Sequence, residues 1–132
     1  MDIILPVTLA SAAAAAILNV WLSIRVGAVR RALGISVGDG GAVNLQRRMR
    51  AQANFVENTP FVLVLIAGIE LTGKGAPWLS YVAALYILAR VLHAYGMDGG
   101  NMAWGRMVGT IATLVVLLGL GIWAALIAGR VL

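Results

Sequence analysis

The stretch MVGTIATLVVLLGLGIWAALIAG, residues 107–129, runs for 23 residues without a charged side chain. As an α-helix it would be about 35 Å long, enough to cross the hydrocarbon core of a bilayer, which is about 30 Å thick. A second charge-free run, IILPVTLASAAAAAILNVWLSI, covers residues 3–24. Both runs predict helices that span a membrane.

The composition of the whole chain agrees with this prediction. Hydrophobic residues make up 61% of the sequence and charged residues only 11%. A soluble domain has about 45–50% apolar and about 25% charged residues. The chain therefore has too few polar groups to cover its own surface, and we expect lipid to surround it.

Two less uniform apolar segments, residues 51–72 and 77–97, predict two further spans. Turn-forming residues separate the four spans: GISVGDGG (34–41) in the long first connection, Gly73, Gly75 and Pro77 in the second, and Gly99, Gly100 and Asn101 in the third. At 132 residues the chain is expected to be one domain, residues 1–132. The predicted fold is all-α, an integral membrane four-helix bundle.

Basic residues are concentrated on one side of this predicted topology. Six surround the first connection: Arg25, Arg30, Arg31, Arg47, Arg48 and Arg50. Arg106 lies at the third connection, whereas the opposite side has only Lys74 and Arg130. The positive-inside rule then places the first and third loops in the cytoplasm and both termini outside. Topology and anionic lipid explain the net charge of +5, so no nucleic-acid partner is expected.

Cysteine and histidine counts exclude several kinds of site. The chain has no cysteine and a single histidine, His93. Disulfides, thiolate metal sites and a cysteine nucleophile are therefore excluded, and no metal site is expected. The Ala- and Gly-rich, Lys-poor composition is typical of a bacterial protein, which favours a bacterial inner membrane.

A polar stripe opens the second span, in RMRAQANFVENTP (48–60). Arg50, Asn54 and Glu57 share one face of a helix because residues at i, i+4 and i+7 lie on the same side. Pro60 follows and is expected to weaken a backbone hydrogen bond nearby. The stripe is either a ligand site or a solvated helix end that holds one ion pair.

The third span contains a second polar group, Arg90 and His93, spaced i, i+3. An arginine at the centre of a span costs about 2.5–3.5 kcal/mol on insertion scales, so it usually faces a partner, a bundle interior or a watery site. The structural alternative is an ion pair between Arg90 and Glu57. A second acid, Glu70, lies near the other end of the second span, and we expect it to be solvated there.

These polar groups, together with Arg106 at the start of the fourth span, are predicted to lie at one depth. Arg106 alone could be a simple topology determinant. Together they would form a cationic pocket with one acid, suited to a small polyanion that carries one amine. Glutathione has two carboxylates, one ammonium and a thiol, and a nearby guanidinium would stabilise its thiolate.

In these residues the sequence resembles the MAPEG family, the membrane-associated proteins in eicosanoid and glutathione metabolism. The matching residues are Arg50, Asn54, Glu57 and Pro60 in RAQANFVENTP, Arg90 and His93 in RVLHAYG, and Arg106 at the fourth span. The resemblance covers spans two to four and is closest to the small prokaryotic members. It implies a homotrimer with active sites between neighbouring subunits, open to the cytoplasm, and glutathione as cosubstrate.

The resemblance also implies a role for each matching residue. Arg50 and Arg90 are expected to clamp carboxylates, and Glu57 to receive the ammonium. Asn54 and His93 would position the tripeptide backbone, and Arg106 would stabilise the thiolate as the catalytic residue.

Several positions depart from the eicosanoid-forming members. Position 53 is Ala where those members often have arginine, and position 97 is Met where they have tyrosine. Met107 follows Arg106 where one branch has serine. These differences argue against eicosanoid synthesis.

Three functions remain open from the sequence. The first is a glutathione transferase- or peroxidase-type enzyme that conjugates or reduces a lipophilic electrophile. The second is a non-catalytic membrane protein with a structural Arg–Glu network. The third is a small transporter, which the clustering of charges at one end disfavours.

Overall fold

The computed structural model of the protein describes residues 3–75 and 77–132. Those residues form four long helices and one short 3-10 helix: α1 (Pro6–Leu33), α2 (Val43–Leu71), α3 (Trp78–Asp98), η1 (Gly100–Met102) and α4 (Trp104–Ala128). Strands are absent from this described part of the chain. Four helices are long and apolar enough to cross a membrane, so the predicted all-α, four-span architecture is confirmed.

Two helices extend well beyond the spans predicted from the sequence. α1 continues through its arginines to Leu33, and α2 begins at Val43 rather than near residue 51. Arginine, leucine and alanine are good helix formers, so the helix does not stop where the apolar run stops. Gly34 ends α1 in a left-handed conformation (φ 67°), which glycine adopts without strain. α2 continues through Pro60.

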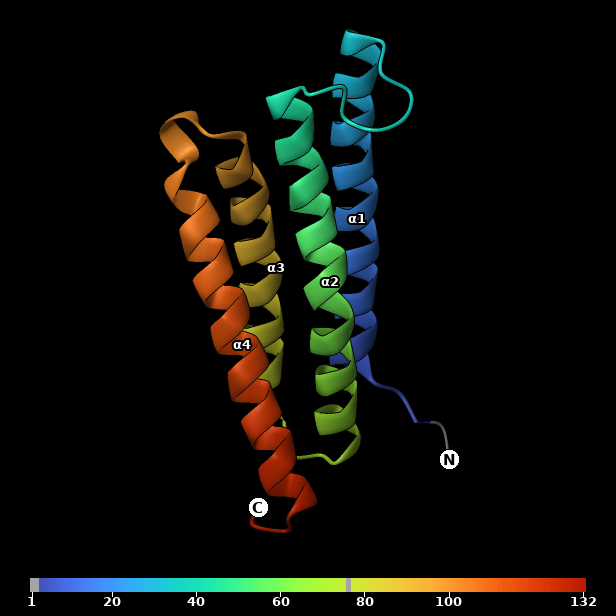
Figure 1. The fold of residues 1–132 in the computed structure, drawn as a ribbon. Helices are drawn as coiled ribbons and strands as arrows, with labels where there is room; N and C mark the ends of the chain where they lie inside the picture. The colour runs from blue at the N-terminus through green and yellow to red at the C-terminus, as the bar shows by residue number, and fades with distance from the viewer. Residues whose placement is uncertain (1–2, 76) are drawn as a thin grey trace.

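Consecutive helices run in opposite directions, as Figure 1 shows. The α1–α2 loop and η1 therefore lie at one end of the bundle, and both termini lie at the other. α3 packs against all three other helices, whereas α1 and α4 lie at opposite sides. This order brings the arginine-rich ends of the helices together.

Apolar side chains form two buried clusters. One joins α2, α3 and α4 towards the terminal end and consists of Val62, Ile66, Ile69, Leu79, Ala83, Tyr86, Val116 and Leu120. The other joins α1, α2 and α3 and consists of Ala15, Leu18, Leu22, Ala51, Phe55 and Ala94. Asn54, Arg90 and His93 belong to neither cluster.

Glycines let α3 and α4 approach closely. Gly105, Gly109 and Thr113 recur every four residues on the buried face of α4. A Cβ atom at Gly109 would lie only 2.5 Å from the Cβ atom of His93 and 2.7 Å from the carbonyl oxygen of Ala89. The close packing of the two backbones therefore depends on the absence of a side chain.

The expectation that Glu70 is solvated at a helix end is wrong. Its carboxylate accepts hydrogen bonds from the backbone N–H groups of Val7 and Thr8, both at 2.8 Å, and from the Thr8 hydroxyl at 2.7 Å. The first N–H groups of a helix have no partner within it, and the helix dipole favours an anion there. Glu70 on α2 thus caps the N-terminus of α1 from another helix.

We predict that Glu70→Gln lowers the free energy of unfolding by about 1–2 kcal/mol, because the anionic cap of α1 is lost. Thermal unfolding in detergent measures this change. Glu57→Gln is the matched control, since it removes an exposed acid from the same helix. Equal losses in the two variants would contradict the capping role.

We predict that Gly109→Ala destabilises the protein by about 1–3 kcal/mol, because the added methyl group overlaps His93 and pushes α4 away. Gly119→Ala on the same helix is the control, since a Cβ atom there meets no atom within 4 Å. Comparable melting temperatures for the two variants would show that the close approach is unimportant.

Candidate functional site

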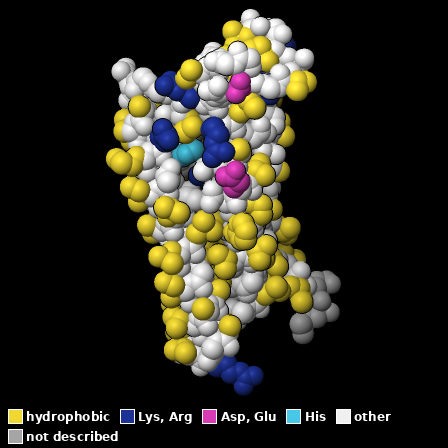
Figure 2. Space-filling model, viewed as in Figure 1, with side chains coloured by type: hydrophobic (Ala, Val, Ile, Leu, Met, Phe, Trp, Pro, Cys, Tyr) yellow, Lys and Arg dark blue, Asp and Glu magenta, His cyan; other side chains and the backbone are white. Residues whose placement is uncertain are grey.

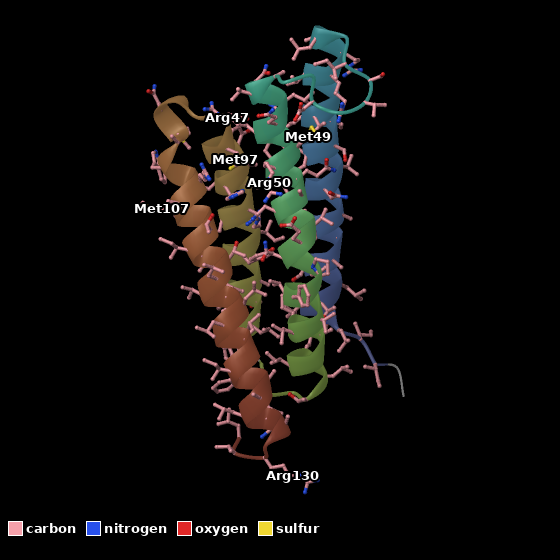
Figure 3. The ribbon with its side chains drawn as sticks, viewed as in Figure 1. Arg47, Met49, Arg50, Met97, Met107 and Arg130 are labelled. Carbon is pink, nitrogen blue, oxygen red and sulfur yellow. The ribbon has the colours of Figure 1, made fainter. Side chains whose placement is uncertain are left out.

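Polar side chains gather at the arginine-rich end of the bundle. Figure 2 shows basic, acidic and histidine side chains in the upper part of one face, above a surface of mainly hydrophobic side chains. Figure 3 places Arg50 on α2, Met97 on α3 and Met107 on α4, all towards this end. Three helices contribute polar residues to this region: Arg50 on α2, Arg90 and His93 on α3, and Arg106 on α4.

Arg50 and Glu57 form the exposed part of this region on α2. Arg50 Nη1 lies 3.7 Å from Glu57 Oε1, and the two side chains are 61% and 58% exposed. An exposed ion pair of this kind contributes at most about 1 kcal/mol. A ligand can therefore replace this ion pair at little cost in free energy.

Arg90 lies beneath them and is only 2% exposed. Its Nη1 donates to Thr113 Oγ1 at 3.0 Å, and its Nη2 donates to Asn54 Oδ1 at 2.7 Å. Nη2 also lies 3.4 Å from His93 Nδ1. Arg90 Nε is buried without a hydrogen-bond partner among the described residues. One guanidinium thus connects α2, α3 and α4.

The predicted structural alternative, an Arg90–Glu57 ion pair, does not form within residues 3–75 and 77–132. Glu57 turns to the exposed face of α2 and meets Arg50 there, while Asn54 reaches the buried guanidinium. The side chains of Asn54, Thr113 and His93 contact Arg90, and no acid among the described residues does. Burial of a cation without a counter-ion is costly, which is unusual for a residue that serves packing alone.

Thr113 contacts Arg90 and was not among the site residues predicted from the sequence. Its hydroxyl accepts from Arg90 and donates to the carbonyl oxygen of Gly109 at 2.8 Å. The spacing of Thr113 with Gly105 and Gly109 on one face of α4 was the available signal. That spacing indicates a buried face of α4, but it does not show that Thr113 contacts Arg90.

Arg106 stands apart from this hydrogen-bonded group. It is exposed near the start of α4 and lines a surface hollow of about 410 Å³ with Ala103, Met107, Thr110 and Ile111. Its guanidinium makes no hydrogen bond or ion pair in the part of the chain that is described. The structure therefore joins Asn54, Arg90 and His93 directly, pairs Arg50 with Glu57, and leaves Arg106 free at the rim.

A second network at the same end has a structural role. Arg25 is buried and forms an ion pair with Asp98, which also lies 3.5 Å from Arg48 Nε. The Arg25 guanidinium lies 4.8 Å from the ring centre of Trp21 and 5.4 Å from that of Tyr95. These contacts fasten α1 to α3 and account for Arg25 and Tyr95 without a ligand.

Comparison with known proteins identifies the family of the chain. The family model of the MAPEG family matches residues 8–126. The chain is 30% identical over 111 residues to inner membrane protein YecN from two strains of Escherichia coli, an alignment that covers 82% of this chain and 84% of YecN. Four membrane-length helices and an inner membrane relative indicate an integral inner membrane protein. The chain belongs to the MAPEG family.

Proposed function

We propose that the protein binds glutathione at its arginine-rich end and activates the thiol to conjugate or reduce a lipophilic electrophile. The observation that carries this proposal is the polar region at one end of the bundle, where Arg50 pairs with the exposed acid Glu57 and where the helices also carry Arg90 and Arg106. Such a surplus of guanidinium groups suits a ligand with two carboxylates, and the acid suits its ammonium group. Membership of the family adds support.

The exposure of each side chain suggests whether it would contact glutathione or support a residue that does. Arg50 and Glu57 are more than half exposed and are the groups that would contact carboxylate and ammonium. The sequence alone suggested that Arg90 clamps a carboxylate, but its two terminal nitrogens already donate to Thr113 and Asn54. We assign to it the support of Asn54 and His93, which would then position the tripeptide backbone.

Arg106 is the group that would act on sulfur. Its guanidinium is exposed and unpaired among the described residues, beside an open hollow lined by Met107 and Ile111. A cation close to a thiol favours the thiolate, which is the nucleophile. The apolar lining beside it would suit the lipophilic substrate.

We propose a homotrimer, the assembly that the family resemblance implies, and the exposure of the polar residues suits a site that a neighbouring subunit completes. Small-molecule sites bury most of their ligand, yet Arg50 and Glu57 project from the surface of one chain. A neighbouring subunit that covers this face would complete the site. The arginine-rich end would face the cytoplasm, where the first and third loops lie by the positive-inside rule.

A non-catalytic role is the second candidate. The observation in its favour is the hydrogen-bonded group around Arg90, which links three helices without any ligand. In that case the polar residues would stabilise the bundle, and their loss would unfold it.

We predict that Arg50→Ala and Glu57→Ala each weaken glutathione binding at least tenfold while the oligomer survives, because both side chains are exposed and make only one weak contact. Calorimetry of the detergent-solubilised protein and its elution volume measure the two effects. Arg31→Ala is the control, because it removes an exposed arginine from the end of α1. Variants that dissociate instead, with no glutathione binding by the parent protein, would favour the structural role.

We predict that Arg106→Ala lowers turnover of an aromatic electrophile by about 10²-fold, because the developing charge on sulfur loses its cation. Glutathione affinity should change only a few-fold, and the ultraviolet thiolate absorbance of the complex should disappear. Arg106→Lys should recover part of that absorbance. Full turnover in Arg106→Ala would remove the thiolate role.

A further inference from the structure

The contact between Arg90 and His93 determines where the imidazole carries its proton. Arg90 Nη2 lies 3.4 Å from His93 Nδ1. A guanidinium in a protein stays protonated and has only hydrogen-bond donors. His93 Nδ1 must therefore offer its lone pair, and a ring with that acceptor carries its one proton on Nε2.

Arg90 is held in the orientation that this contact requires. Thr113 Oγ1 accepts from Nη1 at 3.0 Å, and Asn54 Oδ1 accepts from Nη2 at 2.7 Å. The Thr113 hydroxyl is itself oriented, because it donates to the carbonyl oxygen of Gly109. Acceptors on α2, α3 and α4 thus fix the plane of the guanidinium.

The packing around the ring makes Arg90 its charged partner. Arg90 on α3 contacts Nδ1, and Arg106 lies on α4, the helix that packs against His93. The acid on α2, Glu57, is paired with Arg50 at the exposed surface, and the ring hydrogen-bonds to no carboxylate among the described residues. Gly109 lies against the Cβ atom of His93 and brings α4 close to it.

We infer that Arg90 is a positioning residue that fixes His93 as the neutral Nε2–H tautomer, so that His93 is a hydrogen-bond donor to the ligand. His93 is 3% exposed, and Figure 2 shows part of its side chain among the basic groups, so a ligand meets the edge of the ring only. Its partner is an acceptor, a carboxylate or carbonyl oxygen. With Nδ1 occupied and Nε2 protonated, His93 has no lone pair for the thiol proton, which leaves to water. Glutathione as the ligand rests on the proposed function.

The single histidine makes the tautomer directly measurable. Protein labelled with ¹⁵N-histidine, carrying a histidine-free affinity tag, gives the ¹⁵N signals of one ring in bilayers. We expect a protonated Nε2 and an unprotonated Nδ1 at pH 7, because Arg90 donates to Nδ1. An Nδ1–H tautomer, a mixture or an imidazolium at pH 7 overturns the inference.

Two variants separate direct contact from the general electrostatic field. Arg90→Met should give a mixed tautomer, because it removes the donor to Nδ1. Arg106→Gln removes the neighbouring cation that does not touch the ring, and the Nε2–H tautomer should persist. An unchanged tautomer in Arg90→Met overturns the role of Arg90. If that variant does not fold, the spectrum of the unmodified chain still decides the tautomer.

Glutathione distinguishes this inference from the proposed function. His93→Gln keeps a donor at the Nε2 position and should bind glutathione within about threefold of the parent protein. His93→Asn keeps only the acceptor that faces Arg90 and should bind at least about tenfold more weakly. Equal loss in both overturns the donor role. The predicted tautomer without any response to glutathione supports the inference and rejects the proposed function.

Discussion

A buried guanidinium that has no counter-ion among the described residues is the constraint on which this structure depends. Arg90 lies within a membrane-spanning helix, where an arginine at the centre costs about 2.5–3.5 kcal/mol on insertion scales. Its hydrogen bonds to Thr113 and Asn54 offset part of that cost, and they come from two other helices. The relative rotation of α2, α3 and α4 is therefore restricted to one that keeps the hydrogen bonds of Arg90.

The remaining helix is attached by polar contacts at both of its ends. Glu70 caps the start of α1, and Asp98 pairs with Arg25 near the other end. Apolar packing in lipid has little directional preference, since lipid tails are as apolar as the side chains. Polar contacts at defined positions give the bundle the directionality that its apolar surface cannot.

The sequence alone predicted the four spans and the end at which the polar residues meet. Hydropathy and arginine distribution are properties of single segments, so both can be read without knowing any contact. The structural alternative, an ion pair between Arg90 and Glu57, was wrong, because Asn54 and Glu57 share a helix face and only the packing decides which one is buried. The cap formed by Glu70 was missed, because its partners lie 62 and 63 residues away in the chain. Helix ends were misplaced for α1 and α2, since arginine continues a helix that lipid no longer surrounds.

α1 and α2 are longer than the hydrocarbon core of a bilayer is thick, so each has one part in lipid and one part outside it. α1 and α2 have 28 and 29 residues, about 42 and 44 Å, whereas the hydrocarbon core is about 30 Å thick. About 12 Å of α1 and about 14 Å of α2 therefore exceed this thickness and extend into the headgroup layer or the water beyond it. The polar face lies at that projecting end, directly above a hydrophobic surface. A charged solute and a lipid-dissolved one can thus reach neighbouring parts of the same face, each without leaving the phase in which it is soluble.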